Sequence, residues 1–138
     1  MIPIQQKRLP KKVLQNLDVE VVYLFGSQAE GTAGASSDID IGVLLKKPIP
    51  QTESITPIYN ALYEIFSDSF DMSNFRVIDI VFLDRASLEL CFDVIQHGIV
   101  LHESSPAIRL DFEDRIAALY RDFKPVLRQF NNGVLEKI

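Results

Sequence analysis

The sequence predicts an α+β domain, close to the α/β class, in which a small mixed β-sheet is flanked by helices and followed by a long C-terminal helix. The first observation is length, because 138 residues can form one hydrophobic core but not a core plus a separate substrate domain. The second is that apolar, β-prone runs alternate with segments of helical periodicity. The third is that no repeat, low-complexity stretch or linker divides the chain. We therefore expect residues 1–138 to form a single domain, with a core at about 10–103 and a last helix at about 104–130.

The first half of the chain predicts two helices and two strands around a short connecting helix. Residues 10–17 have a proline in the first turn and an apolar stripe, which favours a short helix. Residues 19–25 are continuously apolar, as in a strand that is buried on both faces. A brief helix is expected from Ser27 to Gly31 or Gly34, followed by a strand at 39–45. Apolar residues at helical spacing then predict a helix over 53–66.

The second half predicts two strands that alternate with two helices. Residues 76–83 form an apolar strand with one charged residue inside it, and 86–96 form an amphipathic helix that Gly98 closes. A short strand follows at 99–101. Ser104 or Ser105 then caps the last helix, with Pro106 in its first turn. We expect Pro125 to kink or end this helix and residues 131–138 to be frayed.

A glycine and a serine follow the first strand. Gly26 allows the backbone to turn sharply and to approach a ligand closely. Ser27 is a good N-cap for the next helix, so that amide groups and a hydroxyl would point into the turn. Such a nest of N–H groups suits phosphate oxygens. For this pair alone, however, an ordinary strand-to-helix turn is the better interpretation.

Two aspartates open the second strand. Because strand side chains alternate, Asp38 and Asp40 share a face with Gly42. Neighbouring carboxylates repel each other unless a cation lies between them, and ligands that are all oxygen favour Mg²⁺ over zinc. A polar start of a strand and a calcium loop are the alternatives, but Ile39 and Ile41 mark a strand and oppose the calcium loop. A phosphate-binding turn beside a magnesium site indicates phosphoryl or nucleotidyl transfer.

Asp79 is the expected third carboxylate of this site. An aspartate inside an apolar strand needs compensation for its charge, and it completes the metal site if its strand lies beside the second one. The alternative is a salt bridge to a neighbouring Arg or Lys. Asp84 lies at the strand end beside Arg85 and is expected to be a solvated helix cap. His97 and His102 have no acid or cysteine at ligand spacing, so we expect both to be structural.

Composition restricts the partners and the location of the protein. With 47% hydrophobic and 24% charged residues, no membrane-spanning run and no apolar leader, the chain is expected to be soluble and to have no membrane partner. Its single cysteine, Cys91, fits a reducing cytoplasm. A net charge of −5 argues against direct nucleic-acid binding. Lys46 and Lys47 form a solvated loop, or else reach a bound triphosphate.

The motif carries a family resemblance. Gly26 and Ser27, ten intervening residues, and Asp38-Ile39-Asp40 resemble the signature of polymerase-beta-type nucleotidyltransferases. The short chain further resembles the minimal nucleotidyltransferase (MNT) antitoxins, which pair with HEPN-domain toxins. The resemblance covers about the first hundred residues and continues more loosely into residues 120–125.

The resemblance implies a polymerase-beta-type core and a Mg²⁺-dependent transfer of AMP from ATP to a hydroxyl group, with pyrophosphate leaving. It implies that Asp38 and Asp40 hold two metal ions and that Asp79 completes the metal on the nucleophile side. It further implies that Gly26 and Ser27 hold the β- and γ-phosphates. The implied acceptor is a tyrosine near the RNase site of a HEPN toxin.

Two other functions remain open. One is transfer to a small molecule, as in antibiotic nucleotidyltransferases, although those carry an additional helical domain for which this chain has no room. The other is an antitoxin that neutralises its toxin by binding alone; this is opposed by the retention of every residue of the motif. Base preference, the number of AMP units and the oligomeric state are not specified by the sequence.

Overall fold

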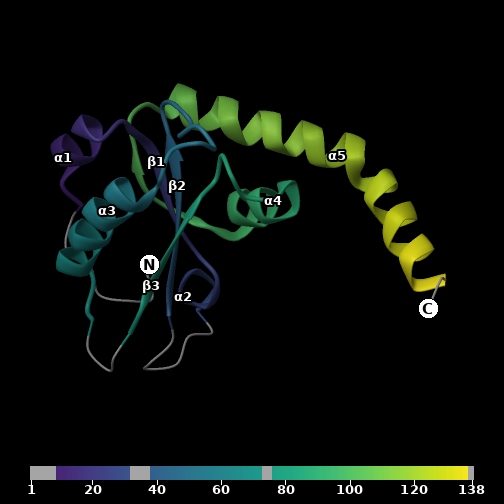
Figure 1. Cartoon of the computed structure of the whole chain (residues 1–138), viewed down its shortest axis with the longest axis horizontal. Helices are drawn as coiled ribbons and strands as arrows, with labels where there is room; N and C mark the ends of the chain where they lie inside the picture. Colours follow the sequence, from purple (N-terminus) through teal and green to yellow (C-terminus); the bar gives the residue numbers. More distant parts are fainter. Residues whose placement is uncertain (1–8, 32–37, 73–75, 137–138) are drawn as a thin grey trace.

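The computed structural model describes residues 9–31, 38–72 and 76–136. Within these ranges the centre of the fold is a four-stranded mixed sheet of order β3-β2-β1-β4 (Figure 1). Strand β2 pairs antiparallel with β1 and parallel with β3, and β4 pairs antiparallel with β1. The strands are β1 (Val19–Phe25), β2 (Ile39–Leu45), β3 (Ile78–Phe82) and β4 (Ile99–Glu103), and the helices are α1 (Lys11–Asn16), α2 (Ser27–Glu30), α3 (Thr56–Ser69), α4 (Leu88–His97) and α5 (Pro106–Glu136). The predicted mixed sheet with flanking helices and a long last helix is confirmed.

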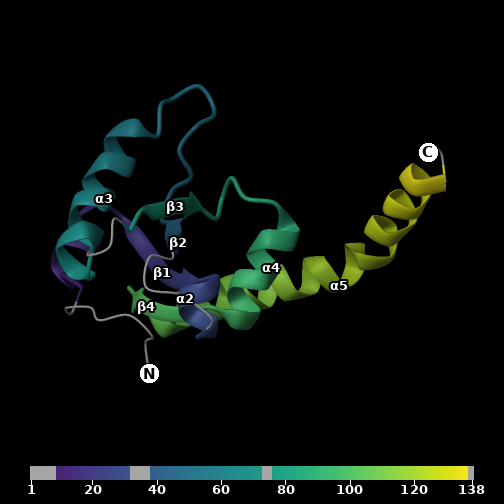
Figure 2. The same cartoon turned by 90° about the horizontal axis from the view of Figure 1, so that it is seen from below.

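Helices cover the two faces of the sheet. On one face, α1 and α3 contribute Leu14, Leu62 and Phe66 to a core that includes alternate residues of β1, β2 and β3. On the other face, α4 and the first half of α5 contribute Val94 and Phe112 to a second core. Figure 2 shows α3 on one side of the sheet and α4 with α5 on the other. Strand β1 is therefore buried on both faces, as its continuous apolar run predicted.

The last helix continues further than the sequence predicted. It runs without interruption from Pro106 to Glu136 and passes through Pro125, so the expectations of fraying at 131–136 and of a last helix ending near 130 were wrong; 137–138 lie outside the described residues. Pro125 is exposed, so water can bond the carbonyl group that lacks a helical donor. The helix changes direction in its second half instead of ending there (Figure 1). Despite its 31 residues, neither α5 nor any other described helix is apolar enough to cross a membrane.

The expected cap of α4 was also wrong. The helix is capped by Ser87, whose hydroxyl oxygen accepts a hydrogen bond from the amide of Leu90 at 3.1 Å. Asp84 instead lies at the end of the sheet, where its carboxylate accepts a hydrogen bond from the backbone of Leu45 and faces Arg115. Burial raises the pKa of Asp84, and these two contacts partly oppose that rise. The aspartate thus interacts with the sheet and α5 and has no part in starting α4.

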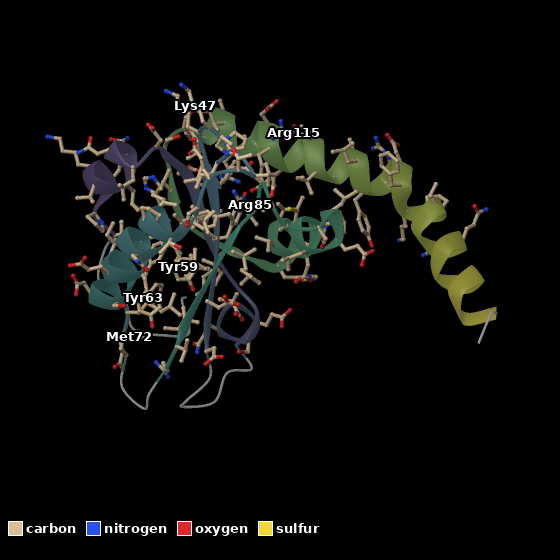
Figure 3. The ribbon with its side chains drawn as sticks, viewed as in Figure 1. Lys47, Tyr59, Tyr63, Met72, Arg85 and Arg115 are labelled. Atoms are coloured by element: carbon tan, nitrogen blue, oxygen red, sulfur yellow. The ribbon has the colours of Figure 1, made fainter. Side chains whose placement is uncertain are left out.

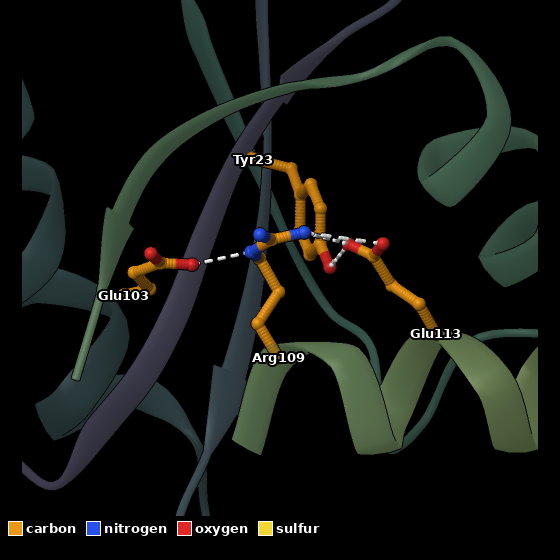
Figure 4. Close-up of polar contacts among 4 residues, drawn as sticks. All are labelled: Tyr23, Glu103, Arg109 and Glu113. Carbon is orange, nitrogen blue, oxygen red and sulfur yellow. Dashed lines mark hydrogen bonds and ion pairs between the residues drawn. The ribbon is translucent and has the colours of Figure 1, made fainter. Parts of the chain in front are cut away.

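A polar network that the sequence did not predict fixes the start of α5 (Figure 4). The guanidinium of Arg109 donates to Glu103 at the end of β4 and, at 3.1 Å, to Glu113 one turn further along α5. The hydroxyl of Tyr23 in β1 donates to the same Glu113 at 2.8 Å. Burial and this hydrogen bond raise the pKa of Tyr23 far above its usual value, so the phenol stays protonated. The root of α5 is therefore bonded to two strands of the sheet.

His102 is buried in β4 with an incomplete set of partners. Its side chain is 7% exposed, and one ring nitrogen, Nε2, has no hydrogen-bond partner among the described residues. Burial lowers the pKa of His102 below its usual value, and the positive charge of Lys11 adds to this effect. A hydrogen bond with the backbone of Val19 and the charges of Glu103 and Glu20 act in the opposite direction without reversing it.

We expect His102 to make the protein less stable in acid. The unfolded chain takes up a proton near pH ~6.5, whereas the folded chain does so only at lower pH, so the free energy of unfolding falls as the pH decreases below about 6.5. This decrease in the free energy of unfolding should be lost in the variant His102→Gln when unfolding by urea is compared at pH 5.5 and pH 7.5. The other histidine, His97, is exposed and pairs with Asp93 at 3.0 Å, so His97→Gln should keep this dependence of stability on pH. An equal change in the free energy of unfolding between pH 7.5 and pH 5.5 for the wild type and His102→Gln would contradict this expectation.

Candidate active site

A tight turn connects β1 to α2. Gly26 has φ 70° and ψ −153°, and Ser27 is the first residue of the four-residue helix α2. A Cβ atom at position 26 would lie 2.4 Å from Oδ2 of Asp40, so glycine is required both by the positive φ and by the close approach of this carboxylate. The expectation that Ser27 is the N-cap was wrong, because Gly26 takes that position and no side chain caps the helix. The turn therefore presents backbone directly to Asp40.

The strand register brings the acids together. Asp40 and Asp79 are paired residues of the parallel strands β2 and β3, so the expectation that the strand of Asp79 lies beside the second strand is confirmed. Asp38 precedes β2 and is exposed, as is Asp79, while Asp40 is half-buried. Burial raises the pKa of Asp40, and the negative charges of Asp79 and Asp38 raise it further. The charges of Asp38 and Asp79 therefore both act on Asp40 at one end of the sheet.

The fit of a metal ion can be judged from these residues. Within the described ranges, no three His, Cys, Asp or Glu side chains converge closely enough to enclose an ion. Burial and the charges of Asp79 and Asp38 nevertheless raise the pKa of Asp40, and the missing Cβ of Gly26 leaves room for its carboxylate against the turn. A divalent cation would relieve the repulsion among the three carboxylates, whose oxygens are the ligands that Mg²⁺ prefers. The residues fit magnesium, and their assignment as its ligands stays a prediction.

The loop lysines lie far from the acids. Lys46 follows the last residue of β2, whereas Asp40 is near its first, so the two are separated by about 20 Å of extended strand. Figure 3 shows Lys47 with Arg115 at the end of the sheet where α5 starts, and Met72, which precedes β3, toward the opposite end. The alternative in which Lys46 or Lys47 reaches a triphosphate at the acids was wrong. Residues 32–37, which connect the turn to Asp38, lie outside the described residues.

One feature of the site was missed by the sequence analysis. The antiparallel register pairs Phe25 with Asp40, which is why the residue after Phe25, Gly26, meets that carboxylate. The spacing between Gly26 and Asp40 showed that they belong to one motif, but the direct contact depends on a register that local sequence does not determine.

A turn against one carboxylate, with a second carboxylate in register beside it, is an arrangement that suits nucleotidyl transfer. The family described as polymerase beta, nucleotidyltransferase, matches residues 9–107. The chain belongs to this family and is a nucleotidyltransferase. No curated protein matches the sequence significantly.

Similar solved structures confirm the resemblance to MNT antitoxins. A toxin–antitoxin structure with AMP-PNP is 25% identical, with a TM-score of 0.67 over 90% of this chain and 94% of that chain. A tri-AMPylated Shewanella oneidensis HEPN toxin in complex with MNT antitoxin gives 22% identity and a TM-score of 0.62, over 90% and 91% of the two chains. The toxin–antitoxin MntA-HepT gives 22% identity and a TM-score of 0.62, over 90% and 92%. The fold of this chain is thus the one found in these complexes.

Proposed function

We propose that this protein is an antitoxin that transfers AMP from ATP to a hydroxyl group of a partner HEPN toxin and thereby inactivates it. The observation that carries this proposal is the juxtaposition of Gly26, Asp40 and Asp79 at one end of the sheet. Support for the partner comes from the likeness to toxin–antitoxin complexes, one of which contains an AMPylated toxin. A protein of this kind would act in the cytoplasm, where its partner and ATP are found.

Each predicted site residue has a role in this reaction. Asp38, Asp40 and Asp79 would hold Mg²⁺, which when bound neutralises phosphate charge and lowers the pKa of the acceptor hydroxyl. The backbone at Gly26 and the Ser27 hydroxyl would bind the β- and γ-phosphates. The acceptor oxygen forms a bond to the α-phosphorus, the bond to pyrophosphate breaks, and the hydroxyl proton is lost to solvent. Positioning and charge neutralisation supply most of the rate enhancement.

A folded protein is the acceptor that best fits the chain. The net charge of −5 disfavours RNA or DNA as the acceptor. A protein that docks beside the acids supplies the remaining wall of the pocket. AMP on a tyrosine near an RNase site adds bulk and negative charge where RNA phosphates must bind, which is sufficient to stop cleavage.

Covalent silencing of the partner is the expected result. After incubation with this chain, Mg²⁺ and ATP, the separated partner should remain inactive as an RNase, and its intact mass should increase by one or more AMP units. The variant Asp40→Ala is the control, because it keeps the docking surfaces and loses the proposed metal site. A partner that is unmodified and regains full RNase activity after separation would instead favour neutralisation by binding alone.

A further inference from the structure

The second half of α5 leaves the body of the protein. Phe112 and Ile116 in the first half are buried against the sheet and α4. The last described contact with the body is the stack of Tyr120 on Phe92 of α4, with ring centroids 3.9 Å apart. Beyond it, residues 121–136, here named the distal arm, extend past α4 and away from the sheet (Figures 1 and 2).

The apolar stripe of α5 continues onto the distal arm. Positions 112, 116, 119, 123 and 126 are three or four residues apart, so these side chains lie on one side of the helix. The first two are core, whereas Leu119, Phe123 and Val126 are 40%, 49% and 57% exposed. The apolar side of α5 thus continues beyond the part of the helix that packs against the sheet.

The distal arm and the candidate site lie on the same side of the sheet. Asp40 shares a face of β2 with Gly42, and a Cβ atom at Gly42 would contact Val94 of α4 at 3.6 Å. The acids therefore occupy the face that α4 and α5 cover, not the face of α1 and α3. A protein seated between α4 and the arm would be on the same side of the sheet as the acids.

The root of α5 fixes the direction of the arm. The bonds among Tyr23, Glu103, Arg109 and Glu113 hold the first turns of the helix to β1 and β4 (Figure 4). The Phe92–Tyr120 stack holds the helix again where it leaves α4. The arm itself is 16 residues long and contains Pro125, and a lone helix of that length is only marginally stable in water. Its exposed apolar side chains indicate that a partner covers it.

We propose that the apolar face of the distal arm, together with the flank of α4 at Phe92, is the surface on which the protein acceptor docks through an apolar helical face. This inference rests on the proposed function and names the surface that delivers the acceptor to the acids. A protein docked between the arm and α4 lies on the face of the sheet that carries the acids.

The area of the arm also favours a globular acceptor over simple arm-to-arm pairing with a second copy. Residues 121–136 span about 24 Å, so two arms that meet only along this length fall short of the ~800 Å² per partner that stable interfaces bury. A globular protein that contacts both the arm and α4 can reach that area.

The test compares two exposed apolar positions on opposite faces of the protein. Phe123→Glu places a charge on the arm, whereas Val13→Glu places one on α1, where Val13 is 44% exposed. Both full-length variants should unfold at the wild-type temperature and bind Mg²⁺ with AMP-PNP as the wild type does in calorimetry. With a co-expressed HEPN toxin as the partner, Phe123→Glu should weaken binding at least about 30-fold and abolish the added AMP mass, while Val13→Glu should change neither.

The outcomes separate the two proposals. If Phe123→Glu binds and modifies the partner as the wild type does, the arm is not the docking surface and the proposed function stands. If the wild type neither binds nor modifies the partner, the proposed function fails, and the docking inference with it. If the wild-type chain alone sediments as a dimer that Phe123→Glu dissociates, the arm pairs two copies and the acceptor docks elsewhere.

Discussion

Alanine in place of Asp38 or Asp40 is expected to abolish nucleotide transfer and to leave the fold intact. Both side chains lie at the exposed end of the sheet, and neither belongs to the two hydrophobic cores. Because Asp79 and Asp38 raise the pKa of Asp40, removal of one carboxylate relieves repulsion in the metal-free protein. Without Mg²⁺ the variants should therefore be as stable as the wild type or slightly more stable.

Calorimetry with Mg²⁺ and a non-hydrolysable ATP analogue measures the metal site directly. Mg²⁺ should raise the unfolding temperature of the wild type, because it binds the folded state, and should fail to do so for Asp40→Ala. Asp93→Ala is the matched control, since Asp93 is an exposed aspartate of α4 that pairs with His97 and not with the three acids. Unchanged transfer by either Asp38→Ala or Asp40→Ala would remove the metal assignment.

Asp79→Asn is expected to slow transfer by orders of magnitude with little loss of ATP binding. The substitution keeps the shape of the side chain that is in register with Asp40 and removes its charge. A group that acts on the attacking hydroxyl affects the transition state more than the bound nucleotide, so the effect should be on the rate of transfer and not on affinity. Asp84→Asn should be nearly silent, because Asp84 lies about five residues further along, at the end of the sheet that faces Arg115.

Single-turnover transfer to the partner, measured beside the affinity for AMP-PNP, distinguishes the two aspartates. Asn at position 79 removes one charge, as does Asn at position 84, so the pair is matched in chemistry and differs only in place. A slow Asp84→Asn and a normal Asp79→Asn would put the reactive end of the sheet beside α5 and not beside the turn at Gly26.

The elements around the motif were predictable because their signals are local. The continuous apolar run of β1 gives a strand buried on both faces, and Gly31 ends α2 with a positive φ as a glycine after a helix commonly does. An aspartate inside an apolar strand is unusual, and this position of Asp79 predicted correctly that its strand lies beside the strand of Asp40. The structure supports the placement of these residues, and their catalytic roles stay predictions.

The features that escaped prediction depend on contacts between distant segments. Pro125 lowers local helix propensity, and the sequence does not show that its exposed position allows the helix to continue. Asp84 has the sequence position of a helix cap, but its hydrogen bond comes from the backbone of Leu45 at the end of β2. The bond between Tyr23 and Glu113 joins residues 90 positions apart, beyond the reach of any periodicity argument.

The strand order has a consequence for the synthesis of the protein. Strand β1 pairs with β2 on one side and with β4 on the other, and β4 is made roughly 50 residues after β2, a delay of several seconds at ~5–20 residues per second. During that interval one edge of an apolar strand is unpaired while the chain is still on the ribosome, where an open edge invites pairing with other chains. Emergence of Ile99–Glu103 closes that edge, and only then can α5 bond to the hydroxyl of Tyr23. The nascent chain is therefore most exposed to aggregation after β2 and β3 have been made and before Ile99–Glu103 has left the ribosome.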